Sequence, residues 1–209
     1  MRQKTSPFFA YMSRMKLIRR WGLMRNTREE DIAQHSLQVA MVAHALAVIR
    51  NREFDGQTDP EHVMALAVYH EAGEVITGDM PTPIKYFNPE IRKAYHAIED
   101  VACHRLLDML PEPLRADYQP LLLQPREGEA HALVKAADKL CAYLKCVEEE
   151  RSGNDEFRSA KAVTLKDIEA MGLPEVERFL QLFGQGFGQT LDELNQGGIN
   201  IFGEAARPL

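Results

Sequence analysis

The 209-residue sequence predicts an all-α protein built as one helical bundle. Along most of the chain, apolar residues recur at the three- and four-residue spacing of helices, and proline, glycine and capping residues separate the runs. No pair of segments shows the alternating pattern of paired strands. A chain of this length suffices for one domain with a sizeable core, so we expect a single domain over residues 1–209.

The first half of the chain contains three helical patterns. We place the start of the second helix directly after the acidic group Glu29–Asp31, because negative charge stabilises a helix N-terminus. It is apolar around most of its circumference, so we expect it at the centre of the bundle. The segment 51–60 reads as a loop in which Asp59 can cap the third helix, with Pro60 at its first position. The predicted helices of this half are 6–19, 32–50 and 60–76.

The second half begins with a proline-punctuated loop over residues 78–89. Asn88–Pro89 then starts a long helix, which prolines end. After a short proline-bearing segment three more helices follow, the last two separated by Gly172–Pro174. The tail 195–209 is rich in glycine and predicted to be irregular. The predicted helices of this half are 88–110, 131–150, 155–171 and 174–194.

The composition favours a cytoplasmic protein that acts on small molecules. The net charge of −6 argues against a nucleic-acid polymer as partner, because general nucleic-acid binders carry a basic face. Three cysteines without a CxxC pair suit buried free thiols in a reducing compartment. The N-terminus has no apolar run with a cleavage site, and no uninterrupted apolar stretch approaches a membrane span. We therefore expect no membrane association.

Four metal-binding side chains lie in helical segments that are otherwise apolar: His35, His70, Glu71 and Asp138. Burying carboxylates among alanines and leucines is costly unless a positive charge compensates them. One divalent ion would supply that charge, and two imidazoles with two carboxylates suit Mn, Co, Fe or Zn better than Ca. Glu74 follows His70 by four residues, which places both on one face of the predicted helix, with Glu74 near bound water.

Taken singly, each of these residues also has a structural interpretation. His35 suits a core histidine, and Glu71 and Glu74 suit solvated helix charges. Asp138 suits a surface ion pair with Lys139. Other catalytic templates fit less well, because HEAGE lacks the second histidine of the zincin HExxH and the sequence has no P-loop, GxGxxG turn or GxSxG elbow. The metal interpretation depends on all four ligands occurring together.

Three stretches resemble a known family. They are RWGLMRNTREEDIAQHSLQVAMVAHALA, YHEAGEVITGDMPTPIKYFN and KAADKLCAYLKCVEE. A histidine, then a histidine–acid pair, then a distant aspartate resemble the HD-domain superfamily of metal-dependent phosphohydrolases, and the strings are most similar to its bacterial 5′-deoxynucleotidases. The similarity extends to about residue 160. It implies an HD-type all-α fold, a homodimer, and removal of phosphate from deoxyribonucleoside 5′-monophosphates.

The resemblance also implies residue roles. One divalent metal ion (Co, Mn, Zn or Fe) would be bound by His35, His70, Glu71 and Asp138. The substrate would contact Arg20, Trp21, His35, Glu71, Asp79, Met80, Pro81, Thr82 and Asp138. Glu74 and Arg20 would be catalytic.

These roles form a mechanistic hypothesis. The ion would lower the pKa of a water and polarise a phosphoryl oxygen, while Glu74 takes or orients the proton of that water. Arg20 would clamp the phosphate with two parallel hydrogen bonds. Trp21 would form a flat wall that rejects a ribose 2′-hydroxyl, and Asp79 would accept a hydrogen bond from the sugar.

One departure from the family pattern falls among the metal ligands, because the His–Asp pair is here His70–Glu71. It is open to three interpretations: a tolerated natural variant, a site with altered metal preference or weakened activity, or an engineered change. The first rival function is therefore a catalytically weakened HD-type protein that binds nucleotide and regulates. An iron oxidoreductase and a purely structural bundle are further alternatives.

Overall fold

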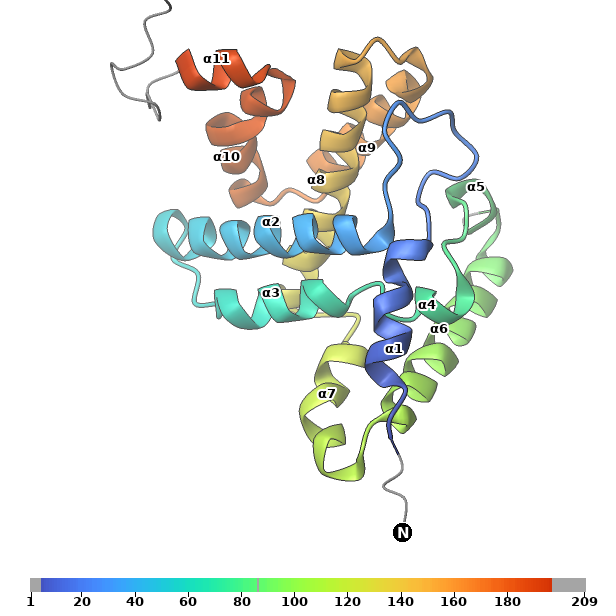
Figure 1. Cartoon of the computed structure of the whole chain (residues 1–209). Coiled ribbons are helices and arrows are strands. Elements are labelled where there is room, and N and C mark those ends of the chain that lie inside the picture. Colours follow the sequence, from blue (N-terminus) through green and yellow to red (C-terminus); the bar gives the residue numbers. More distant parts are fainter. Residues whose placement is uncertain (1–4, 86, 197–209) are drawn as a thin grey trace, which may run out of the picture.

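The computed structural model describes residues 5–85 and 87–196, and within them every regular element is a helix (Figure 1). The all-α prediction is therefore confirmed. The helices, with 3₁₀ turns marked η, are α1 (Phe8–Met12), η1 (Ser13–Leu17), α2 (Ile32–Glu53), α3 (Pro60–Tyr69), α4 (Glu74–Thr77), α5 (Thr82–Lys85), α6 (Pro89–Met109), η2 (Glu112–Leu114), α7 (Arg115–Leu122), α8 (Glu129–Arg151), η3 (Asp155–Phe157), α9 (Arg158–Ala170), α10 (Pro174–Phe183), η4 (Gly184–Gly188) and α11 (Leu191–Gln196). The predicted tail 195–209 lies outside the described residues except for its first two, which end α11.

Capping side chains start the helices that matter for the site. Asp31 accepts hydrogen bonds from two amides in the first turn of α2, both at 2.9 Å. Asp59 caps α3 in the same way, with Pro60 at the first position, as predicted. Asn88 accepts a hydrogen bond from the Ile91 amide at 2.7 Å at the start of α6. Local chemistry therefore fixes where these three helices begin.

The core consists of two apolar clusters. The larger joins α2, α3, α8 and α10 around Leu46, Val63 and Leu140. The smaller joins α1, α4, α6 and α7 around Phe8 and Leu106. Because all five side chains are almost fully buried, these two clusters fix how the helices cross.

Helix α2 lies at the centre of the bundle, as its sequence predicts. It packs on α3, α8 and α10, and Figure 1 shows α8 crossing behind it. By length and composition α2 could cross a membrane, with a mean hydropathy of 1.4, but 56% of that stretch is buried inside the protein. Its apolar character is therefore explained by its place in the core.

The predicted continuous helix 60–76 is wrong. It is divided into α3 and α4, and between them the amides of Ala72 and Glu74 bond to carbonyls three residues back, each at 3.0 Å. This tighter winding lets the chain pack closely against α6, where a Cβ atom on Gly73 would lie 3.2 Å from the sulfur of Cys103. Packing between helices therefore overrides the local helical pattern at this point.

Other predicted boundaries also differ from the structure. The expected helix 6–19 is α1 followed by the 3₁₀ turn η1, and α2 continues as far as Glu53. The expected helix 174–194 is interrupted by the glycine-rich turn Gly184–Gly188, because glycine is a poor helix former. Short helices α5 and α7 occupy segments predicted to be irregular. None of these differences moves a predicted site residue out of the bundle.

Candidate metal centre and nucleotide site

Four side chains from three separate parts of the chain lie close together. They come from α2, from α8 and from the turn that follows α3, and these three helices pack on one another. His35 comes from the first turn of α2, and Asp138 comes from the middle of α8. His70 and Glu71 lie in the tight turn between α3 and α4. One potential ligand atom of each residue lies within 4.8 Å of the others. The sequence-predicted ligands are therefore brought close enough together that they could bind one small cation.

The distances define the centre of this cluster. His35 Nε2 lies 2.9 Å from Asp138 Oδ1 and 3.7 Å from Glu71 Oε1. His70 Nε2 lies 3.8 Å from the same Glu71 oxygen. The His35 side chain is completely buried, whereas that of Asp138 is 36% exposed. The cluster is thus closed on the α2 side and accessible beside Asp138.

The turn between α3 and α4 changes how the acids are presented. In a continuous helix, Glu74 would share a face with His70 and Glu71 would point about 100° away. The turn is instead wound with three-residue hydrogen bonds, which align residues three apart, so Glu74 follows Glu71 on the same side. Accordingly, after burial, the charge of Glu71 contributes most to raising the pKa of Glu74. Glu74 therefore lies beside Glu71.

Hydrogen bonding prepares His70 as a ligand. Its Nδ1 lies 2.6 Å from the carbonyl oxygen of Ala67. Because a carbonyl only accepts, Nδ1 carries the proton and Nε2 offers a lone pair to the cluster. Nε2 and the Oε2 atom of Glu71 are buried and have no hydrogen-bond partner in the described part of the protein. Two orphaned donor atoms within one cluster fit a divalent cation, which would satisfy both.

The charges of the cluster also suit a cation. Burial lowers the pKa of His70, which keeps its imidazole neutral. Burial alone would raise the pKa of Asp138, but the hydrogen bond with His35 and the nearby positive charge outweigh it and lower that pKa. Burial would also raise the pKa of Glu71, but the positive charge of Arg20 opposes burial and the pKa is lowered. A neutral imidazole at His70 and ionised carboxylates at Glu71 and Asp138 are the states in which these residues bind metals.

Arg20 lies against two of the candidate metal ligands, Glu71 and Asp138. Its Nη1 donates to Glu71 Oε1, and its Nη2 is 3.9 Å from Asp138 Oδ1. Burial would lower the pKa of Arg20, but the surrounding carboxylates, Glu71 first, raise it above its ordinary value. A permanent positive charge therefore borders the cluster, where a phosphate bound beside the metal would meet it.

Trp21 is held beside Arg20 in an unusual conformation. Its φ of 58° lies in the left-handed region, which costs a residue with a side chain about 1–3 kcal/mol. The ring packs on Phe157 with centroids 5.3 Å apart, and Nε1 donates a hydrogen bond to Glu30 Oε2 at 3.0 Å. These two contacts explain how the strained conformation persists.

Sequence reasoning missed Glu30. It treated Glu29, Glu30 and Asp31 as one acidic group at a helix start, but the structure gives each a different partner. Glu29 forms an exposed ion pair with Arg19, Asp31 caps α2, and Glu30 is buried against Arg20 and Trp21. No local signal distinguishes the three, because the difference comes from the fold of the preceding loop.

Glu74 and Asp79 form an acidic group behind the cluster. Burial, Glu71 and Asp79 together raise the pKa of Glu74 to about 9. Burial also raises the pKa of Asp79, although Arg20 opposes this effect. Glu74 is therefore protonated at neutral pH unless a further positive charge is bound nearby, and a metal in the cluster would supply that charge.

The remaining predicted substrate residues lie in the segment that leads into α5. Met80 and Pro81 are half-buried, and Thr82 is exposed at the first position of α5. Asp79, in the same segment, is the one that interacts electrostatically with Arg20 and Glu71. A contact between this segment and a substrate remains a prediction.

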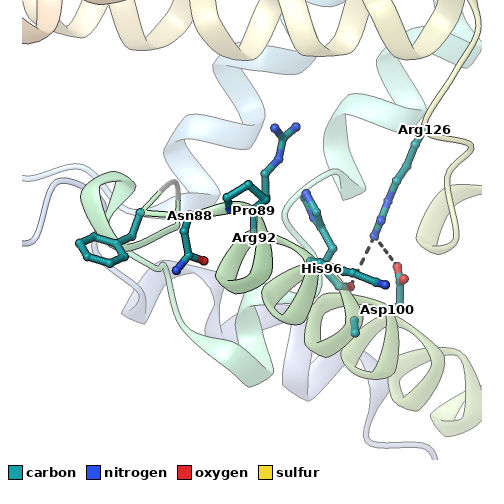
Figure 2. Close-up of a pocket in the computed structure, with 9 residues that line it drawn as sticks. Asn88, Pro89, Arg92, His96, Asp100 and Arg126 are labelled. Carbon is teal, nitrogen blue, oxygen red and sulfur yellow. Dashed lines mark hydrogen bonds and ion pairs between the residues drawn. The ribbon is translucent and has the colours of Figure 1, made fainter.

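A large open cavity lies elsewhere, on α6 (Figure 2). It has a volume of about 650 Å³ and shares no residue with the four-ligand cluster. Two of its basic side chains face acidic partners: Arg126 lies 2.7 Å from Asp100, and His96 Nδ1 lies 2.9 Å from Glu99. The contact with Glu99 gives His96 a structural role. The cavity is separate from the candidate site, because it shares none of its four residues.

The geometry of this site agrees with a comparison against protein families. A family model described as 5′-deoxynucleotidase YfbR-like matches residues 7–187, which include every candidate site residue. The chain belongs to the YfbR-like 5′-deoxynucleotidase family. The resemblance seen in the sequence is therefore confirmed, and the match reaches beyond residue 160.

Curated members of the family are similar over nearly their whole length. A 5′-deoxynucleotidase of Erwinia tasmaniensis is 52% identical over 192 residues, which cover 91% of this chain and 97% of the relative. The 5′-deoxynucleotidase YfbR of Escherichia coli is 52% identical over 194 residues, covering 92% and 98%. Similarity of this extent makes the family assignment independent of any single motif.

Solved structures share the fold at lower identity. An HD-domain phosphohydrolase from Listeria innocua has a TM-score of 0.76 at 20% identity, covering 86% of this chain and 87% of that one. A cyanophage S-2L HD phosphohydrolase, bound to dA and one catalytic Zn²⁺ ion, has a TM-score of 0.61 at 20% identity, covering 90% and 99%. The HD-type helical fold expected for the YfbR-like family is therefore present in this chain.

Proposed function

We propose that this YfbR-like protein hydrolyses deoxyribonucleoside 5′-monophosphates to deoxyribonucleosides and phosphate, using one divalent ion. The proposed ligands are His35, His70, Glu71 and Asp138, and their convergence within 4.8 Å is the observation that supports the proposal most strongly. Two nitrogen and two oxygen donors suit Mn, Co, Zn or Fe.

The chain's own residues have separate tasks in this proposal. A bound divalent ion supplies Lewis acidity, which activates water and polarises a phosphoryl oxygen. Arg20 binds the phosphate and offsets its charge, since its guanidinium borders two of the ligands. Glu74 would accept a proton from the attacking water or orient that water in its ionised form, which a nearby bound cation would favour against its raised pKa.

The sugar is expected to lie between Trp21 and the segment before α5. Trp21 offers an indole face, and Asp79 a carboxylate that can accept a hydrogen bond from a sugar hydroxyl. Met80, Pro81 and Thr82 complete the proposed contact segment. A tight wall at the 2′ position would disfavour ribonucleotides, because the additional hydroxyl would meet apolar surface without a partner.

We also propose a cytoplasmic homodimer without nucleic-acid or membrane partners. The acidic net charge of −6 supports a small-molecule substrate over a polymer. Support for the dimer comes from exposed apolar side chains on the packed helices α2 and α3, which include Leu37, Met41, Met64 and Val68. Apolar groups gathered on neighbouring helices are typical of protein interfaces.

A phosphate-release assay tests the function directly. With Mn²⁺ or Co²⁺, the purified protein should release phosphate from dAMP at least about tenfold faster than from AMP, because the wall beside the sugar excludes a 2′-hydroxyl. Removal of the metal with EDTA should stop the reaction, and adding metal back should restore it. Equal rates on both nucleotides, or no turnover with any divalent ion, would contradict the proposal.

The Glu71→Asp variant tests the departure at the HD pair. We expect kcat/KM for dAMP to stay equal or to rise, because a shorter carboxylate still reaches a metal at about 2.0–2.2 Å but holds Arg20 less tightly. The assay compares both proteins with Mn²⁺, Co²⁺ and Zn²⁺. A large loss of kcat/KM with every metal would show that the pocket is built around the longer side chain.

The same residue supports one alternative function, a weakened protein that binds nucleotide and regulates. Glu71 is the specific observation that favours it, because its additional methylene displaces a ligand by about one C–C bond. Bound metal without turnover, together with a thermal shift in dAMP, would support this alternative over hydrolysis.

A further inference from the structure

A single buried carboxylate oxygen connects the two proposed substrate residues. Glu30 Oε2 accepts a hydrogen bond from Arg20 Nε at 3.1 Å and another from Trp21 Nε1 at 3.0 Å. The Glu30 side chain is only 9% exposed. Since both donors share one acceptor, moving that oxygen would move the guanidinium and the indole together.

The backbone places Glu30 at this position. Arg20 N donates to the carbonyl oxygen of Glu30 at 2.9 Å, and Ile32 N donates to that of Ile18 at 3.0 Å, so the two ends of the loop run side by side. At the far end of the loop, Glu149 on α8 accepts hydrogen bonds from the amides of residues 27 and 28. The loop is therefore fixed at its base, by the backbone pairing, and near its tip, by Glu149. Glu30 lies at the base, where its side chain contacts Arg20 and Trp21.

Glu30 limits the orientation of Arg20. The guanidinium has three nitrogens, and each faces a different carboxylate: Nε faces Glu30, Nη1 faces Glu71, and Nη2 faces Asp138. Glu30 binds the inner edge of the guanidinium, whereas Glu71 and Asp138 are the candidate metal ligands. The outer edge is thereby turned toward the position of the phosphate, and the contact with Glu30 can persist while a substrate is bound.

Glu30 also limits the position of the Trp21 indole. The left-handed backbone of Trp21 is unfavourable by itself, so contacts must maintain it. Phe157 supports one side of the ring, and the hydrogen bond to Glu30 fixes its rotation. A rotated indole would open space beside the sugar, where the proposed deoxy preference is decided.

We infer that Glu30 is a positioning residue that sets phosphate binding and deoxyribose selectivity together, through Arg20 and Trp21. The inference rests on the proposed function of those two residues. It assigns Glu30 no contact with substrate or metal. Its effect should therefore appear in KM and in the ratio of dAMP to AMP turnover, with metal binding unchanged.

Three variants test this inference. Glu30→Leu removes the acceptor at similar volume, and we expect KM for dAMP to rise about tenfold and selectivity over AMP to fall about tenfold, as loss of a hydrogen bond to a charged group predicts. Glu30→Gln keeps an acceptor oxygen without the charge, so it should restore much of both quantities. Glu29→Leu is the matched control, because Glu29 pairs with Arg19 at the surface and should leave both quantities unchanged.

The outcomes separate the inference from the function on which it rests. Wild-type protein that hydrolyses dAMP selectively, with Glu30→Leu unchanged in KM and selectivity, would overturn the inference alone. Equal losses of selectivity in Glu29→Leu and Glu30→Leu would also overturn it, because the effect would then not depend on the hydrogen bonds that Glu30 alone makes to Arg20 and Trp21. If Glu30→Leu does not fold, Glu30→Asp replaces it, because its carboxylate withdraws by about one C–C bond from both donors. Unchanged selectivity in folded Glu30→Asp would refute the inference as well.

Discussion

Replacing Asp138 by asparagine is expected to lower kcat/KM for dAMP by about a thousandfold, because a bound metal supplies several kcal/mol of transition-state stabilisation and each 1.36 kcal/mol is a factor of ten. Asparagine keeps the shape of the side chain but removes the charge that attracts the ion. Asp138 Oδ1 lies 2.9 Å from His35 Nε2, so the variant removes a carboxylate at the centre of the cluster. Metal content per chain and the thermal shift on adding Mn²⁺ should both fall with activity.

A matched control for this variant lies one helix away. Asp167 is a half-exposed aspartate on α9. It forms an ion pair at 2.6 Å with Lys139, which is the residue that follows Asp138 in α8. Asp167→Asn should therefore leave activity and metal content within about twofold of wild type, because exposed ion pairs contribute little. Full activity in Asp138→Asn, at unchanged metal content, would remove Asp138 from the proposed metal centre.

Replacing Arg20 by alanine is expected to lower kcat/KM for dAMP by about a hundredfold to a thousandfold, the usual cost of losing a charged group that stabilises the transition state. The metal should remain bound, because Arg20 is a cation beside Glu71 and Asp138 and competes with the ion for both. Loss of activity with retained metal distinguishes a phosphate-binding role from a ligand role. Metal content and phosphate release, measured on the same sample, provide the comparison.

The neighbouring arginine provides the control for this variant. Arg19 pairs with Glu29, and both side chains are 64% exposed, so Arg19→Ala should change turnover little. Arg20→Ala leaves Glu30 and Glu71 without their cation, so a second variant, Arg20→Lys, retains the charge and should fold where alanine does not. It should recover part of the activity, because lysine lacks the planar pair of donors. Wild-type turnover in a folded Arg20 variant would show that the phosphate is bound elsewhere.

The family context makes Glu71 the residue of greatest interest. Relatives at 52% identity are named 5′-deoxynucleotidases, and the fold matches HD phosphohydrolases. In this chain the second member of the HD pair is a glutamate whose Oε1 also accepts a hydrogen bond from Arg20. The longer side chain therefore joins the candidate metal ligands to the proposed phosphate-binding arginine. Whether this contact limits turnover is the question that Glu71→Asp addresses.

The sequence determined the helical class and the centre of the bundle, and it indicated the candidate ligand set. Helical periodicity and capping are local properties, so Asp59 with Pro60 and Asn88 could be identified as helix starts before the fold was known. The polar groups His35 and Asp138 could be identified because each interrupts an apolar segment. Both kinds of signal lie within a few residues of the feature they predict.

Only the tertiary structure decided how the polar side chains of the site are oriented and which partners they have. The break after α3 depends on Gly73 packing beside Cys103 of α6, a contact that no local pattern contains. Lys139 pairs with Asp167 on another helix, so Asp138 is left to face the metal site. Glu30 became a buried acceptor because the loop returns beside its own start. Local rules fix where helices form, but side-chain pairing between distant segments depends on how those helices cross, since only packing brings them within hydrogen-bond range.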